Sequence, residues 1–190
     1  MTTVNILGKG NMGTAIAGLV EKAGYTVETF DSSDADKPVT GDVVVLAVPY
    51  PAIAQILSER SEQLAGKVVV DITNPLDYQT GSLVVPADSS AAAEIAAAVP
   101  NARVLKAFNT TFGPTLTTGT VGDQTTTVLI AGDDERAKAQ LTEIVTGAGL
   151  NAADTGPLAR ARELEALALL QIGLAMSGKA SWTGGFALHA

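Results

Sequence analysis

The sequence has 190 residues, no cysteine and a single histidine, His189. The absence of cysteine excludes disulfide scaffolds, thiolate nucleophiles and Fe–S clusters. One histidine argues against a zinc site and against hydrolysis by a serine activated by histidine. We therefore expect no bound metal, and the composition identifies no catalytic residue.

Basic residues and long apolar runs are also scarce. Twelve Lys and Arg face twenty Asp and Glu, a net charge of −8 with no basic cluster, so a nucleic acid would be repelled. The longest apolar run, 164–176, is interrupted by Glu165 and Gln171 and is shorter than the roughly 20 residues that span a bilayer. Because the first residues lack the pattern of a signal peptide, we expect a cytoplasmic protein that contacts neither nucleic acid nor membrane.

Hydrophobic residues make up 46% of the chain, which is typical of a globular protein. Short β-branched runs alternate with segments of helical period, which predicts an α/β fold with a mainly parallel sheet of the doubly wound, Rossmann-like type. We expect one domain over 1–190, with a C-terminal helix and tail at about 157–190 and a surface loop at 115–127. Strands are expected at 4–7, 25–30, 43–48, 67–73, 103–108, 126–131 and 151–155, and helices at 11–23, 51–64, 90–99, 133–146 and 157–177.

The connection after the second predicted strand is unusually short. Only eleven residues, 32–42, separate Asp31 from Val43. That length leaves no room for both a crossover helix and an outer third strand. We therefore expect a loop that crosses to the other side of the first strand and leaves the adenine side of a nucleotide pocket more open.

A glycine-rich segment follows the first strand and opens the first helix. Its sequence, Gly8-Lys9-Gly10-Asn11-Met12-Gly13, matches the dinucleotide-binding pattern G-x-G-x-x-G in the strand–turn–helix setting that this pattern requires. Gly8 would make the tight turn, Gly10 would admit a pyrophosphate to the backbone and Gly13 would pack helix against sheet. Free N–H groups at the start of the helix would then bind the anion, even in an acidic protein.

The residues after the second strand bear on the choice between NAD and NADP. Asp31 lies 18 residues after Gly13, where a carboxylate would bond the adenosine ribose and favour NAD. Ser32 and Ser33 act in the opposite direction, because two hydroxyls in that turn would suit a 2′-phosphate. A capping role for Asp31 is the structural alternative. The sequence leaves both cofactors open.

The chain resembles the NADP-binding family typified by the NADPH-dependent reductase of the deazaflavin coenzyme F420, especially its short single-domain bacterial members. The resemblance covers nearly the whole chain. It rests on the order and spacing of five stretches: residues 8–13, 47–51 (AVPYP), 70–76 (VDITNPL), 105–110 (LKAFNT), and the terminal pair 161–165 (ARELE) with 182–186 (WTGGF). The chain departs from longer relatives in its short 32–42 segment and in Asp31-Ser32-Ser33, where they resemble Gly-Ser-Arg.

The resemblance implies hydride transfer between a nicotinamide and a small, flat acceptor of the deazaflavin or flavin type, with NADP as the family's usual cofactor. Such a reaction needs little help from acid–base side chains, because the cofactor carries the chemistry. By family position, residues 8–12 would hold the pyrophosphate, and Ser32 and Ser33 would face the ribose. Val48 and Pro49 would line the cofactor, Asn74, Pro75 and Leu76 would approach the nicotinamide, and Phe108, Asn109 and Thr110 would border the acceptor.

Several alternatives remain open. Asn74-Pro75 is also a common turn, Phe108 also suits a core, and Lys106 would be a residue of the sheet edge or of the solvent face if it is not catalytic. Tyr50 follows a strand end and would be a proton donor if the substrate were a carbonyl or an imine, although packing is its commoner role. A non-catalytic dinucleotide-binding module that senses redox state is the alternative to an enzyme. The final helix is apolar on several faces, which predicts a homodimer in which a second copy covers part of it; the alternative is a helix buried wholly within one chain.

Overall fold

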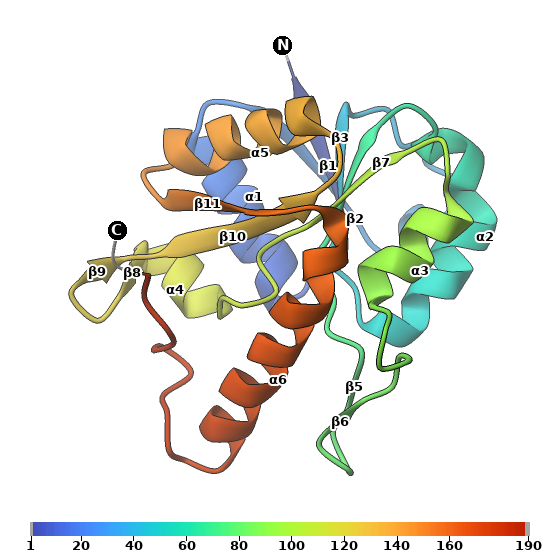
Figure 1. Cartoon of the computed structure of the whole chain (residues 1–190). Coiled ribbons are helices and arrows are strands. Elements are labelled where there is room, and N and C mark those ends of the chain that lie inside the picture. Colours follow the sequence, from blue (N-terminus) through green and yellow to red (C-terminus); the bar gives the residue numbers. More distant parts are fainter. Residues whose placement is uncertain (1, 189–190) are drawn as a thin grey trace.

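The computed structural model describes residues 2–188 and is built around one seven-stranded sheet (Figure 1); His189 lies outside the described residues. The strand order is β11-β10-β7-β4-β3-β1-β2, and every neighbouring pair is parallel except β7 with β10. The sheet strands are β1 (Thr3–Leu7), β2 (Thr26–Phe30), β3 (Val43–Leu46), β4 (Val68–Asp71), β7 (Arg103–Lys106), β10 (Thr127–Gly132) and β11 (Asn151–Gly156). The predicted Rossmann-like, mainly parallel sheet is confirmed.

Helices cover both faces of this sheet. They are α1 (Asn11–Lys22), α2 (Ile53–Leu64), α3 (Ala91–Ala98), α4 (Gly113–Thr118), α5 (Glu135–Gly147) and α6 (Ala161–Met176). Side chains of β3 alternate between the faces: Val43 and Val45 join a core that includes residues of α1 and α5, whereas Val44 and Leu46 join one that includes residues of α2 and α3. An unbroken apolar strand is therefore buried on both sides, as parallel sheets require.

The short connection after β2 is confirmed as a loop. Residues 32–42 contain one 3-10 turn, Ser32–Asp34, and β1 pairs with β2 on one side and with β3 on the other. Arg60 of α2 is buried and fixes the loop by donating to the carbonyls of Asp34, Ala35 and Lys37 at 2.7, 2.9 and 2.7 Å. One buried guanidinium thus satisfies backbone groups that a missing strand and helix would otherwise have paired.

The predicted surface loop at 115–127 is wrong. This segment contains the end of α4 and a hairpin of β8 (Thr120–Val121) and β9 (Gln124–Thr125). The threonine hydroxyls donate to nearby carbonyls, as when Thr118 donates to Pro114, and Thr126 is buried and donates to the carbonyl of Thr115. Threonine is ambiguous between loop and helix because its side chain can pair locally with the backbone in either.

The final helix projects from the sheet beside a second hairpin, β5 (Leu76–Asp77) with β6 (Ser82–Leu83), which the sequence did not predict (Figure 1). A 3-10 turn, Leu158–Arg160, precedes α6, so the observed helix begins at Ala161, four residues after the predicted start at 157. Leu170 and Met176 expose 56% and 57% of their surface on α6. None of the helices within residues 2–188 has the length and apolar character needed to cross a membrane.

Candidate cofactor site and active site

The glycine loop lies at the carboxyl ends of β1 and β3, where the order of the strands along the sheet reverses. Gly8 has a φ of +123°, and a Cβ there would lie 2.1 Å from the carbonyl oxygen of Ala47, in the loop after β3. A Cβ at Gly13 would lie 2.0 Å from the carbonyl oxygen of Gly8. These two glycines are required by the protein's own close packing, which is the role that the motif predicts for them.

Gly10 has a different environment. A Cβ at Gly10 would meet no atom within 4 Å, so the fold does not require glycine there. Gly10 is also the N-cap of α1, and no side chain in the described part of the chain caps this helix. The open space at Gly10 and the uncapped backbone N–H groups of Asn11 and Met12 together fit a pyrophosphate held by backbone donors.

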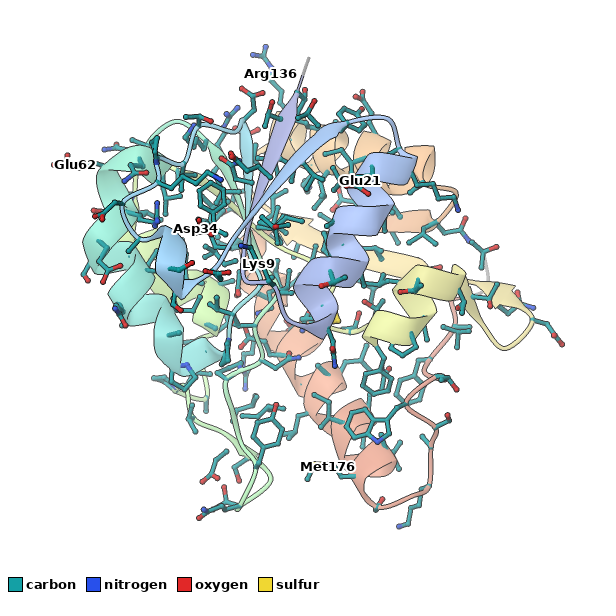
Figure 2. All side chains as sticks on the ribbon, turned by 180° about the vertical axis from the view of Figure 1, so that it is seen from behind. Lys9, Glu21, Asp34, Glu62, Arg136 and Met176 are labelled. Atoms are coloured by element: carbon teal, nitrogen blue, oxygen red, sulfur yellow. The ribbon has the colours of Figure 1, made fainter. Side chains whose placement is uncertain are left out.

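The loop after β2 places Asp31 beside the glycine loop, where Figure 2 shows Lys9 and Asp34 close together. Lys9 Nζ lies 2.8 Å from Asp31 Oδ2 and 3.1 Å from Asp34 Oδ2. Hydrogen bonding to Lys9, followed by the contacts from Ser33, holds the pKa of Asp31 well below its usual range. Asp31 also caps the turn at Ser32–Asp34, so the capping alternative is realised, and any contact with a ribose would come in addition.

A cavity of about 310 Å³ lies next to this loop. It is lined by residues of three predicted cofactor segments, including Gly8, Asp31, Ser32 and Val48, and by Phe30 and Arg60. Pro49 is exposed and starts a 3-10 turn over Tyr50–Ala52. The fold therefore brings the first-strand, second-strand and third-strand candidates to one hollow.

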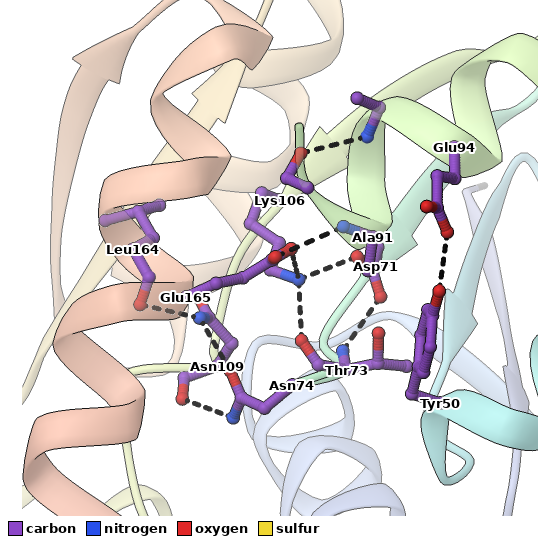
Figure 3. Close-up of polar contacts among 12 residues, drawn as sticks. Tyr50, Asp71, Thr73, Asn74, Ala91, Glu94, Lys106, Asn109, Leu164 and Glu165 are labelled. Atoms are coloured by element: carbon purple, nitrogen blue, oxygen red, sulfur yellow. Dashed lines mark hydrogen bonds and ion pairs between the residues drawn. The ribbon is translucent and has the colours of Figure 1, made fainter. Parts of the chain in front are cut away.

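The predicted nicotinamide segment and acceptor segment meet at the carboxyl ends of β4 and β7 (Figure 3). Asn74 Nδ2 donates to the carbonyl of Asn109 at 3.1 Å, and Asn109 Nδ2 donates to Asn74 Oδ1 at 3.0 Å and to the carbonyl of Leu164 at 3.0 Å. Two buried oxygens, Asn109 Oδ1 and Thr73 Oγ1, have no hydrogen-bond partner within residues 2–188. Both oxygens are enclosed by the protein, so they are polar groups of the interior and not ligand-facing acceptors.

A buried charge cluster, which the sequence analysis did not predict, supports this corner (Figure 3). Lys106 Nζ lies 2.7 Å from Asp71 Oδ2, 2.7 Å from Glu165 Oε1 and 2.6 Å from the carbonyl oxygen of Thr73. All three charged side chains are fully buried. The expectation of an edge or solvent position for Lys106 is wrong, because β7 lies between β4 and β10.

The cluster links three separate elements to the nicotinamide segment. Glu165 Oε2 accepts the N–H of Ala91 at the start of α3, and Asp71 Oδ1 accepts the N–H of Thr73. Burial raises the pKa of Glu165, while the charge of Lys106 opposes that rise. Because every ammonium proton has an acceptor within 2.7 Å, Lys106 fixes the loop that contains Asn74 rather than facing a ligand.

The remaining candidates divide by exposure. Phe108 has a φ of +61°, and its side chain is buried in the core, as its alternative role required; Asn109 and Thr110 follow it directly. Thr110 is buried, and its carbonyl accepts from Gln171 of α6 at 3.2 Å. Pro75 is buried and Leu76 is half-buried.

Tyr50 does not present a free hydroxyl. Its hydroxyl donates to Glu94 of α3, and burial followed by this hydrogen bond raises the pKa of Tyr50 to about 12. The phenol is therefore protonated at neutral pH but already engaged.

Comparisons with known proteins give consistent similarities. A family model described as NADP oxidoreductase, coenzyme F420-dependent, matches residues 18–75. The F420-dependent NADP reductase of Methanocaldococcus jannaschii is 29% identical over 171 residues, which cover 87% of this chain and 76% of that protein. Metalloreductase STEAP3 of Rattus norvegicus is 29% identical over 185 residues, and the match covers 87% of this chain but only 36% of that protein. A crystal structure from Arthrobacter sp. FB24, assigned to the F420-dependent NADP reductases, has a TM-score of 0.88 at 24% identity and is covered in full, as is this chain.

Proposed function

We propose, from the premise that this chain is a relative of the coenzyme F420-dependent NADP oxidoreductases, that it transfers hydride between a nicotinamide and a small deazaflavin- or flavin-type acceptor. The resemblance expected from the sequence is confirmed by the family model and by the relative that spans most of the chain. The coarser statement, an NAD(P)-dependent oxidoreductase, is confirmed with it. The acceptor and the choice between NAD and NADP are the parts that we propose.

The observation that carries the proposal is the open space at Gly10 beside the uncapped start of α1. Gly8 and Gly13 are explained by contacts within the protein, whereas Gly10 has open space beside its backbone that a bound group would occupy. In our proposal the N–H groups at Gly10, Asn11 and Met12 hold the pyrophosphate, since a helix start attracts anions. The nucleoside end would enter the cavity lined by Asp31, Ser32 and Val48.

The nicotinamide end would reach the Asn74–Asn109 pair. Asn109 Oδ1 is buried, so the half-buried amide of Asn74 is the group of this pair that would meet the carboxamide of a nicotinamide. Lys106 holds the Thr73 carbonyl at 2.6 Å, so the loop before Asn74 is fixed before a ligand arrives. Preorganised donors and acceptors of this kind contribute orientation, which is the main requirement for direct hydride transfer.

The hydrogen bonds of the two candidate proton donors favour a flat redox acceptor over a carbonyl or an imine. When bound, the dihydronicotinamide supplies a hydride and is oxidised, and a deazaflavin or flavin accepts that hydride and takes its balancing proton from water. Reduction of a carbonyl or an imine needs a positioned donor. Lys106 and Tyr50, the two candidates, are both engaged, one in the buried cluster and one with Glu94.

Turnover tests the proposal directly. Purified protein with NADPH or NADH is mixed in turn with coenzyme F420, a free flavin, a quinone and a ferric chelate, and oxidation of the nicotinamide is followed by absorbance. We expect oxidation with the deazaflavin or the flavin. If no acceptor is reduced while the nucleotide binds tightly, the non-catalytic redox-sensing module is the correct description.

The predicted homodimer remains part of the proposal. Leu170 and Met176 of α6 and Tyr78 of the β5–β6 hairpin are exposed, and a hollow of about 710 Å³ lies between these elements. Burying this apolar surface against a second copy would remove it from water. Light scattering after gel filtration should give the mass of two chains, and a mass of one chain would contradict this expectation.

A further inference from the structure

Three hydrogen-bond donors from two separate loops converge on one carboxylate beside the proposed nucleotide cavity. Asp31 Oδ1 accepts the backbone N–H of Ser33 at 2.8 Å and its hydroxyl at 2.6 Å. Asp31 Oδ2 accepts from Lys9 Nζ, which comes from the glycine loop, at 2.8 Å. Converging donors around an anion are the arrangement that binds a phosphate, and here the anion is part of the chain.

The same ammonium contacts a second carboxylate. Asp34 Oδ2 accepts from Lys9 Nζ at 3.1 Å and from the N–H of Asp31 at 3.0 Å. One cation and two carboxylates leave the group with a net charge of −1. Lys9 and Asp31 expose 42% and 41% of their side chains, so a ligand can reach both.

These contacts change the meaning of the two serines. The Ser33 hydroxyl already donates to Asp31, so it has no proton left for a 2′-phosphate while that bond persists. A ribose hydroxyl, in contrast, can donate to Asp31 Oδ2, which accepts only Lys9 within the described chain. The cavity beside the cluster is lined by Asp31, Ser32 and Gly8, which places the cluster at the nucleoside end of the site.

We propose that Lys9 is a specificity-determining residue: paired with Asp31 it forms a clasp that accepts a nucleotide with a free 2′-hydroxyl, and released from Asp31 it binds a 2′-phosphate. This inference rests on the proposed function, because it assumes a dinucleotide in this site. In the native chain a 2′-phosphate meets net negative charge and must compete with Asp31 for all three donors. NAD is therefore preferred, although the relatives' names refer to NADP.

The test is calorimetric titration of the full chain with NAD and with NADP. The parent protein should bind NAD more tightly. Asp31→Ala removes one charge, frees both donors of Ser33 and leaves Lys9 paired with Asp34 alone. It should shift the NADP-to-NAD affinity ratio toward NADP by about tenfold or more. Asp36→Ala is the matched control, since Asp36 is exposed in the same loop and lies outside the cluster; it should leave the ratio nearly unchanged.

The double variant Lys9→Met/Asp31→Ala isolates the role of Lys9. It should lose most of the NADP affinity gained by Asp31→Ala, and the gain in the single variant should weaken with added salt. If Asp31→Ala leaves the ratio unchanged, or if the double variant keeps the gain, the inference is overturned while the proposed function stands. If neither nucleotide binds to any of the proteins, the proposed function fails and the inference fails with it.

Discussion

Replacing Lys106 with Met would remove the one cation that the described structure places against two fully buried carboxylates. Asp71 and Glu165 would keep their burial but lose a partner at 2.7 Å each. Breaking a buried ion pair from one side costs about 3–5 kcal/mol, because the remaining charge is left uncompensated. Against a total stability of roughly 5–15 kcal/mol, Lys106→Met should be severely destabilised at pH 7.

The loss should depend on pH in a defined direction. Burial already raises the pKa of Glu165, and without the opposing charge of Lys106 that pKa should lie further above its unfolded value of about 4. Groups with a raised folded pKa favour folding below the unfolded pKa and lose that stabilisation as pH rises through the folded pKa. The deficit of the variant should therefore be smaller at pH 5 than at pH 7.

Urea unfolding followed by circular dichroism at both pH values measures this deficit. At pH 7 the thermal midpoint should also fall by roughly 6–20 °C for a chain of this size. Adding Glu165→Gln to Lys106→Met removes one buried charge and should restore part of the loss. Arg160→Met is the control: Arg160 and Glu163 are exposed and 3.4 Å apart, so losing their contact should cost less than about 1 kcal/mol. A Lys106→Met deficit as small as that of the control, or equal at the two pH values, would refute the reasoning.

Three further predictions follow from single contacts. Gly10→Ala should change the unfolding midpoint little but weaken dinucleotide binding by about tenfold or more, because its Cβ enters the space assigned to the pyrophosphate. Gly13→Ala should instead destabilise the fold, because its Cβ would lie 2.0 Å from the carbonyl oxygen of Gly8. Equal effects of the two variants on stability would contradict this distinction. Ser90→Ala should cost about 1 kcal/mol in urea unfolding, because the Ser90 hydroxyl caps α3 by accepting from Ala93 at 3.1 Å, and no measurable change would show that the cap is dispensable. Tyr50→Phe should keep both the rate of hydride transfer to a deazaflavin or flavin and the pH dependence of that rate up to about pH 9. A fall of about a hundredfold in the rate would identify Tyr50 as a proton donor and favour a carbonyl or imine substrate.

The fold class followed from local patterns in the sequence. The apolar run from Val43 to Val48 predicted a central strand, which the structure has at Val43–Leu46. The glycine spacing after β1 predicted the turn at Gly8 and the helix that follows it. The eleven residues at 32–42 predicted a loop by length alone. These features are local because chain geometry limits what a short segment can form.

The sequence predicted least well where a side chain can hydrogen-bond to the backbone in more than one secondary structure. It also predicted poorly where residues far along the chain determine whether a side chain is buried. Threonine content at 115–127 indicated a loop, although the backbone there continues α4 and then forms a hairpin. Phe108 was a candidate at the acceptor side with a core position as the alternative, and its side chain is part of the core. Composition alone predicts neither the hairpin nor the burial of Phe108, because both depend on how neighbouring elements pack against these residues.

The sequence by itself determined the strands and the glycine turn, because each depends on a pattern within a short stretch. It also determined the family resemblance, which depends on the order of several such stretches along the chain. Only the tertiary structure decided that Lys106 is buried between Asp71 and Glu165, and that Lys9 meets Asp31 from the opposite loop. The carboxylates of the first cluster lie 35 and 59 residues from the lysine, and Asp31 lies 22 residues from Lys9. The energy of a charge depends on its burial and its partners, and both are set only when distant segments pack together.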